Sequence, residues 1–287
     1  MKPHARSPKG NRAAADLEVG ALARAAAAIE SRNLDEAERI AREILSRRPQ
    51  HPEALQLLGA VLLGQKRPRE AIAPLEAAAR NGANPELETH LAKALREIGR
   101  LSEALTWLYR AIERQPAYAP AFQELGDLLR SMRRYAEAAT VLNRGLAAAP
   151  TVPELSLALG GVYLDQGKAE HAKVSFARAL SIVPGNPDAL LGIGIALQYE
   201  GEFSRAAERF QRVLARDPDH HRARMNLGYC LIELGRLDDG IACLRVAVQA
   251  APHLYGSALR MLIAGGRGRF WLKRSAAAES LGHDSEP

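Results

Sequence analysis

Residues 155–184 carry the clearest hydrophobic pattern of the chain, LSLALGGVYLDQGKAEHAKVSFARALSIVP. Large apolar residues stand four positions apart on each side of a polar stretch, which is the spacing of one face of an α-helix: Leu159 and Tyr163, then Phe176 and Leu180. Pro184 ends the pattern because proline cannot continue a helix. The stretch therefore predicts two short amphipathic helices joined by a turn at residues 165–167.

The same pattern returns along the chain in steps of 33 or 34 residues. The small residue of the second helix, Ala172, has six counterparts: Ala37, Ala71, Ala104, Ala138, Ala206 and Gly240. The small residue of the first helix, Gly160, has six as well: Ala25, Gly59, Ala92, Gly126, Gly194 and Gly228. Small side chains at fixed positions let two helices cross closely, while large ones beside them fill the space.

A helix–turn–helix unit of this length, with small residues at the helix crossing and a proline near its end, resembles the tetratricopeptide repeat. The resemblance covers about residues 18–254. It implies an all-α, right-handed superhelical solenoid of seven repeats. Apolar residues on one face of residues 255–263, followed by Gly265 and Gly266, predict a C-terminal capping helix.

Three segments follow from this pattern. Residues 1–16 are basic and lack hydrophobic periodicity, which predicts a disordered tail or an arm that binds an acidic partner. Residues 17–265 are expected to form the solenoid with its capping helix. Residues 266–287 are expected to form a basic and aromatic C-terminal tail. The net charge of +6 comes mostly from the two ends. Since the solenoid itself is nearly neutral, we expect it to bind no nucleic acid.

The C-terminal tail holds Phe270, Trp271 and Leu272 beside arginines and a lysine. Two interpretations stay open: these residues fold back over the last helix pair, or they anchor a membrane or a partner. The sequence has no apolar run of about 18 residues, so no membrane-spanning helix is predicted. No apolar segment follows the N-terminal charges, so no signal peptide is predicted either. The C-terminal tail is therefore the one candidate for membrane contact. A cytoplasmic protein is the expectation.

Pro74 lies inside the predicted second helix of the second repeat, which begins near Pro68. A proline there cannot donate a hydrogen bond to the Glu70 carbonyl, and its ring crowds the preceding turn. The sequence therefore predicts a kinked helix and a local irregularity between residues 68 and 86.

No residues form a recognisable catalytic site. Asp217, Asp219, His220 and His221 cluster between two repeats, where turn and helix-cap roles suit them better than metal binding. Cys230 and Cys243 have neither metal-ligand nor disulfide spacing, which predicts two thiols in the core. We therefore expect no enzymatic activity, no metal and no cofactor.

The resemblance places function on the concave wall, which one face of each first helix would line. That face is polar in the third and fourth repeats and apolar in the fifth to seventh. The candidate peptide-binding residues are Leu157, Gly161, Leu191, Ile195, Met225, Asn226, Tyr229 and Ile232. Asn226 would bind a peptide backbone, and the flexible Met225 and amphipathic Tyr229 suit a binding surface best. The alternative is that these residues pack against the neighbouring repeat and expose little.

The resulting hypothesis is a non-enzymatic adaptor that binds a peptide or protein segment, mainly in repeats five to seven. The alternative is a regulatory or substrate-presenting subunit of a separate enzyme such as a transferase, and oligomerisation through the terminal repeats also stays open. The positions at which tetratricopeptide co-chaperones grip a C-terminal carboxylate hold apolar residues here, as at Leu157, Leu191 and Met225. Binding of a chaperone tail is therefore not predicted.

Overall fold

The structure is a computed structural model, and it describes residues 8–80, 82, 84–264 and 274–282. Helices and no strands occur among these residues, which confirms the all-α prediction. The chain divides into two compact units, residues 1–132 and 133–287.

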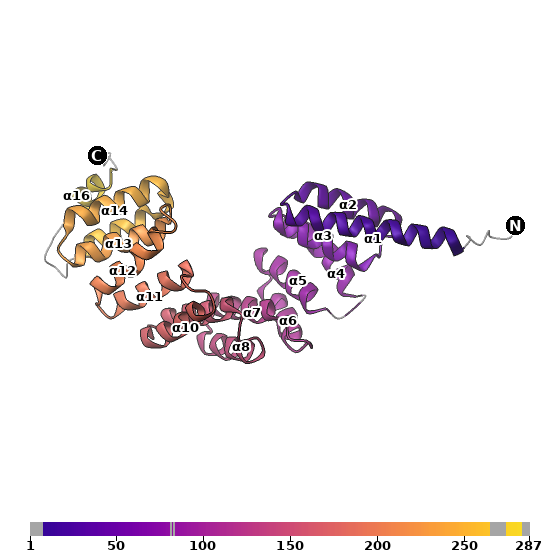
Figure 1. The fold of residues 1–287 in the computed structure, drawn as a ribbon, viewed down its shortest axis with the longest axis horizontal. Helices are drawn as coiled ribbons and strands as arrows, with labels where there is room; N and C mark the ends of the chain where they lie inside the picture. Colours follow the sequence, from indigo (N-terminus) through magenta and orange to yellow (C-terminus); the bar gives the residue numbers. More distant parts are fainter. Residues whose placement is uncertain (1–7, 81, 83, 265–273, 283–287) are drawn as a thin grey trace. The chain divides into compact units, whose positions relative to one another are not determined.

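In unit 1 each helix packs against the next one along the chain (Figure 1). The helices are α1 (Pro8–Glu30), α2 (Leu34–Arg47), α3 (Pro52–Gly64), α4 (Pro68–Ala79), α5 (Pro85–Glu97), α6 (Leu101–Ile112) and α7 (Ala119–Ser131). The first helices of successive pairs, α1, α3, α5 and α7, also contact one another. This is the packing of stacked helix pairs.

Unit 2 repeats the arrangement and adds the C-terminal helices. Its elements are α8 (Tyr135–Ala148), α9 (Pro153–Asp165), α10 (Ala169–Ile182), α11 (Pro187–Tyr199), α12 (Phe203–Leu214), α13 (His221–Glu233), α14 (Leu237–Ala250), the 3₁₀ turn η1 (Pro252–Leu254), α15 (Tyr255–Ala264) and α16 (Arg274–Ser280). Here α9, α11, α13 and α15 contact one another in order. The number of repeats and the superhelical path stay predictions.

The small residues lie at the helix crossings, as the spacing predicted. A Cβ atom added to Gly160 of α9 would lie 2.6 Å from the ring of Phe176 in α10, and one added to Gly194 of α11 would lie 2.5 Å from Phe210 in α12. Such distances are far below van der Waals contact, so a larger residue would force the helices apart.

The turns inside the pairs share one backbone feature. The residue seven positions after each small first-helix residue has a positive φ angle, in the left-handed region that favours glycine. Four of these residues are Gly99, Gly167, Gly201 and Gly235, and three are Arg32, Lys66 and Arg133. The second helices α8, α10 and α14 each end shortly before a proline, in agreement with the sequence.

Two sequence predictions stay untested. α4 runs from Pro68 to Ala79 through Pro74, but residues 81 and 83 in the predicted irregular stretch lie outside the described residues, so the irregularity stays a prediction. α1 begins at Pro8, ahead of the boundary expected at residue 17, and the three-segment division also stays a prediction.

The C-terminal helices cover the end of the last helix pair. Ala277 and Leu281 pack in one apolar cluster with Leu259 and Leu262 of α15. The Arg245 side chain of α14 donates two hydrogen bonds to the Ser280 carbonyl, at 3.0 and 2.9 Å. Ile263, which the sequence placed on the apolar face of the capping helix, is 44% exposed. Phe270, Trp271 and Leu272 lie outside the described residues.

Candidate functional site

An open groove of about 450 Å³ lies in unit 2 along α11, α13 and α15. We call it the α13 groove, since α13 supplies more of the lining residues than either of the other two helices. It is lined by Ile195, Gln198 and Tyr199 of α11, Arg222, Met225, Asn226 and Tyr229 of α13, and Arg260 and Met261 of α15. These residues belong to the first helices of the pairs and to the capping helix, which contact one another directly.

The amide side chains of the groove are held by hydrogen bonds. Asn226 Nδ2 donates to the Arg222 carbonyl at 2.8 Å, and Gln198 Nε2 donates to the Asn226 carbonyl at 3.1 Å. The Tyr229 ring meets the Phe203 ring edge-on, with 5.9 Å between the ring centroids. These contacts orient a polar and aromatic surface before any ligand arrives.

The charge of the groove is positive. Arg222 and Arg260 are exposed at its rim, and Arg260 Nη2 donates to Ser257 Oγ at 2.9 Å. Among the described residues that line the groove, none carries a carboxylate. The floor is apolar, so the site combines an apolar surface with two guanidinium groups.

Four of the eight candidate residues line this groove: Ile195, Met225, Asn226 and Tyr229. The other four do not. Ile232 is 1% exposed and packs on Gly240, Leu191 belongs to the core cluster around Phe210, Leu157 packs against the cluster that holds Phe176, and Gly161 is buried. Met225 and Asn226 of the groove are also largely buried, at 7% and 8% exposed, and peptide binding by any of the eight residues stays a prediction.

Five lining residues are not among the eight candidates: Gln198, Tyr199, Arg222, Arg260 and Met261. Arg222 precedes Met225 by three positions and so lies on the same helix face, a signal that the spacing contained. Arg260 and Met261 lie on α15, outside the repeat, and reach the groove through the contact of α15 with α13. No repeat position predicts that contact.

The polar face predicted for the third and fourth repeats lies on α5 and α7 of unit 1. It differs from the α13 groove because its charged side chains pair with one another. Glu124 of α7 is buried, and its Oε1 lies 2.6 Å from Arg96 Nη1 of α5, while Lys93 Nζ lies 3.8 Å from its Oε2. Burial raises the pKa of both Glu124 and Asp127 above their ordinary values, against the opposing effect of the nearby cations. Burial also lowers the pKa of His90.

Burial and helix capping account for the cysteines and for His220, which the sequence analysis singled out. Burial raises the pKa of the Cys230 thiol to about 11 and raises that of Cys243 as well, so neither thiol is activated. His220 Nδ1 accepts a hydrogen bond from the Ala223 amide at 3.2 Å, which confirms its cap role. No group of three metal-ligating residues occurs among the described residues. No helix described there is long and apolar enough to cross a membrane.

Comparisons with known families agree with this architecture. The tetratricopeptide repeat model matches residues 124–187 and 191–255. The model of subunit 3 of the anaphase-promoting complex, or cyclosome, matches residues 30–111. No curated protein matches the sequence significantly.

Solved structures with the same architecture come from several bacteria. A tetratricopeptide repeat protein from Parabacteroides merdae is 15% identical with a TM-score of 0.67, over 86% of this chain and 98% of that one. The protein TTC0263 from Thermus thermophilus is 21% identical with a TM-score of 0.53, over 63% and 98%. MamA from Desulfovibrio magneticus is 17% identical with a TM-score of 0.52, over 60% and 97%. At these identities the likeness shows the fold. Residues 124–187 and 191–255 therefore carry tetratricopeptide repeats, and the chain as a whole has the fold of such proteins.

Proposed function

We propose that this chain is a non-catalytic adaptor that binds an extended segment of a partner protein in the α13 groove. The observation that carries the proposal is the composition of the lining: an apolar floor, two exposed arginines and, among the described residues, no carboxylate. A segment with apolar side chains flanked by Asp or Glu has the complementary chemistry.

Each part of the groove has a role in this proposal. Met225 and Met261 adapt their shape to apolar side chains, because the thioether chain is flexible and polarizable. Tyr229 offers an amphipathic ring, and Gln198 and Asn226 offer amides to the backbone of the segment. Arg222 and Arg260 pair with carboxylates as planar forks, which favours acidic partners over neutral ones.

The test is a selection of peptides from a random displayed library against the full-length protein. Fluorescence anisotropy then gives the Kd of the selected peptides for the wild type and for the double variant Arg222→Glu, Arg260→Glu. Both residues are exposed, so the variant keeps its core. We expect acidic and apolar peptides, and a Kd weakened by about tenfold or more in the variant, which corresponds to about 1.4 kcal/mol.

The matched control is Arg212→Glu, which reverses an exposed charge on α12 away from the α13 groove. It should leave the Kd within about twofold, since Arg212 does not line the groove and salt screens exposed charges that make no direct contact. Selected peptides that bind the double variant as tightly as the wild type would contradict the proposal. Peptides that respond equally to the control would point to net charge rather than to the groove.

A further inference from the structure

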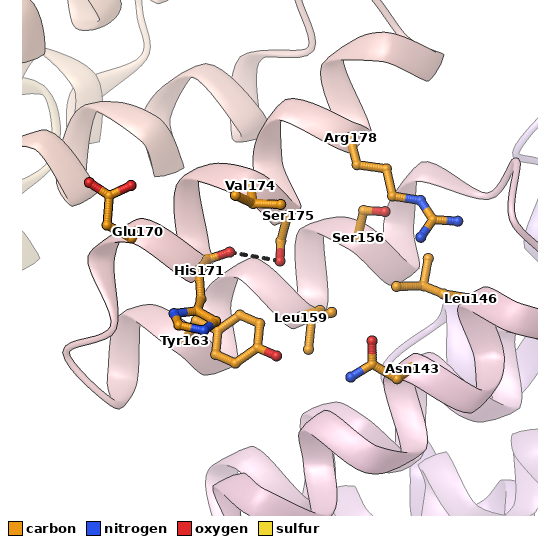
Figure 2. Close-up of a pocket in the computed structure, with 10 residues that line it drawn as sticks. All are labelled: Asn143, Leu146, Ser156, Leu159, Tyr163, Glu170, His171, Val174, Ser175 and Arg178. Carbon is orange, nitrogen blue, oxygen red and sulfur yellow. Dashed lines mark hydrogen bonds between the residues drawn. The ribbon is translucent and has the colours of Figure 1, made fainter.

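A second hollow lies in unit 2 between α8, α9 and α10, with a volume of about 340 Å³ (Figure 2). We call it the Ser156 pocket. It is lined by Asn143 and Leu146 of α8, Ser156, Leu159 and Tyr163 of α9, and Glu170, His171, Val174, Ser175 and Arg178 of α10. It shares no lining residue with the α13 groove.

The pocket exists because small residues replace large ones. Ser156 stands four positions before Gly160, and in four other copies that position holds a large buried residue: Leu55, Glu88, Phe122 and Leu190. Ser175 stands three positions after Ala172, where other copies hold Ile40, Trp107 and Val141. The fifth repeat therefore lacks the side-chain volume that fills this place elsewhere in the chain.

The walls combine apolar surface with aromatic rings. Leu146 and Leu159 are buried beneath the opening, whereas Val174 is 71% exposed at its edge. The rings of Tyr163 and His171 lie side by side at one end, with 5.2 Å between centroids, and Ser156 and Arg178 lie at the other end (Figure 2). The volume of about 340 Å³ is enough for an aromatic side chain.

One polar group in the pocket lacks a partner. Ser156 is fully buried, and its Oγ has no hydrogen bond within the described part of the chain. The nearby Ser175 Oγ, in contrast, donates to the His171 carbonyl at 3.0 Å. Buried hydroxyl groups are normally hydrogen-bonded, so the free Ser156 hydroxyl indicates a place where a ligand group binds.

We propose that the Ser156 pocket receives an aromatic side chain with a hydrogen-bond donor, tryptophan or tyrosine, presented by a partner protein. The ring takes the volume that Phe122 takes in the fourth repeat and packs on Leu146 and Leu159. Its N–H or O–H donates to Ser156 Oγ. Tryptophan and tyrosine are the side chains that combine a large apolar body with such a donor, and both are enriched in binding interfaces.

The test uses indole as the probe, added to the full-length protein and followed by the methyl NMR signals of Leu146, Leu159 and Val174. We expect saturable shifts of these signals. Toluene, a ring without a donor, should bind about fivefold more weakly, since a net hydrogen bond contributes a factor of this order. The variant Ser156→Ala should remove that preference while keeping the volume of the pocket.

Two further variants block the space. Ser156→Phe restores the residue type of the fourth repeat and should weaken indole binding by about tenfold or more. Val174→Glu changes an exposed residue, so it leaves the core intact if Ser156→Phe fails to fold, and it should weaken binding by threefold or more. Indole shifts that are unchanged in Val174→Glu and in the folded Ser156→Phe protein would overturn the proposal.

The partner is tested with displayed peptides selected against the wild type and counter-selected against Val174→Glu. Enrichment of peptides that carry tryptophan or tyrosine, with a Kd unaffected by Arg222→Glu, supports a second binding site for a protein. Peptides without these residues would overturn the proposal. The α13 groove is tested by the double variant Arg222→Glu, Arg260→Glu, and the Ser156 pocket by Val174→Glu and Ser156→Phe, so failure of one site is distinguishable from failure of the other.

Discussion

Phe176 shows how single residues set the spacing of the helices. Its ring lies against Gly160 in its own pair and against Gly192 in the next one, and a Cβ atom on either glycine would overlap the ring. Glycine inside a helix costs about 1 kcal/mol relative to alanine. Packing therefore explains the two glycines. Alanine at either position would favour the helix, but its methyl group would prevent the close contact with the Phe176 ring.

This explanation predicts the effect of Gly160→Ala. The added methyl group would lie 2.6 Å from the Phe176 ring, so we expect a loss of about 1–3 kcal/mol in the free energy of unfolding, as for overpacked cores. The control is Gly20→Ala in α1, where no atom lies within 4 Å of the added Cβ, and which should gain about 0.5–1 kcal/mol. Urea denaturation measures both. Equal effects of the two changes would contradict the packing argument.

At the scale of single residues, the sequence predicted where the helices cross, but it did not predict the Ser156 pocket or all of the left-handed turn residues. The positions of Gly160 and Ala172 recur, so spacing alone identified them. The left-handed turn residue cannot be predicted where it is Arg32, Lys66 or Arg133, because arginine and lysine, unlike glycine, do not indicate a positive φ angle. The Ser156 pocket was also missed, since a small residue in one copy becomes informative only when the structure shows that no other side chain fills its place.

The helix α4 carries the element-scale prediction. Pro74 lies in its interior, so the Glu70 carbonyl has no amide donor from that position. We expect Pro74→Ala to raise the free energy of unfolding by about 1–3 kcal/mol, measured by thermal and urea denaturation. Pro68→Ala at the first position of the same helix should change it by less than about 1 kcal/mol, because proline suits that position. A destabilised Pro74→Ala protein would contradict this expectation and show that the native packing needs the proline.

The helices themselves were largely predictable, because periodicity and prolines mark their ends. The capping helix was predicted from its apolar face, whereas α16 was not, since its seven residues, RSAAAES, are too short to show a period. The candidate site illustrates the same limit. Ile195, Met225, Asn226 and Tyr229 follow repeat positions, but Arg260 joins the α13 groove through α15, which lies outside the repeat.

At the scale of the whole molecule, the two candidate sites belong to one unit and the ion pairs around Glu124 to the other. The α13 groove and the Ser156 pocket both lie in unit 2, and the paired charges around Glu124 lie in unit 1. In a stack of repeats each pair depends mainly on its direct neighbours. Binding at either site should therefore not need the N-terminal pairs.

This independence predicts the behaviour of a fragment of residues 119–287, which begins at α7 so that the predicted fourth repeat stays whole. Its helices α8–α15 form a continuous series of contacts and include every lining residue of both sites. We expect it to fold cooperatively, measured by circular dichroism, and to bind indole and the selected peptides with Kd values within about twofold of the full-length protein. The same fragment with Arg222→Glu and Arg260→Glu should no longer bind the acidic peptides but should still bind indole. The two arginines line the α13 groove and do not line the Ser156 pocket. If the folded fragment bound neither probe, the N-terminal unit would have to contribute to binding, and the assignment of both sites to unit 2 would be wrong.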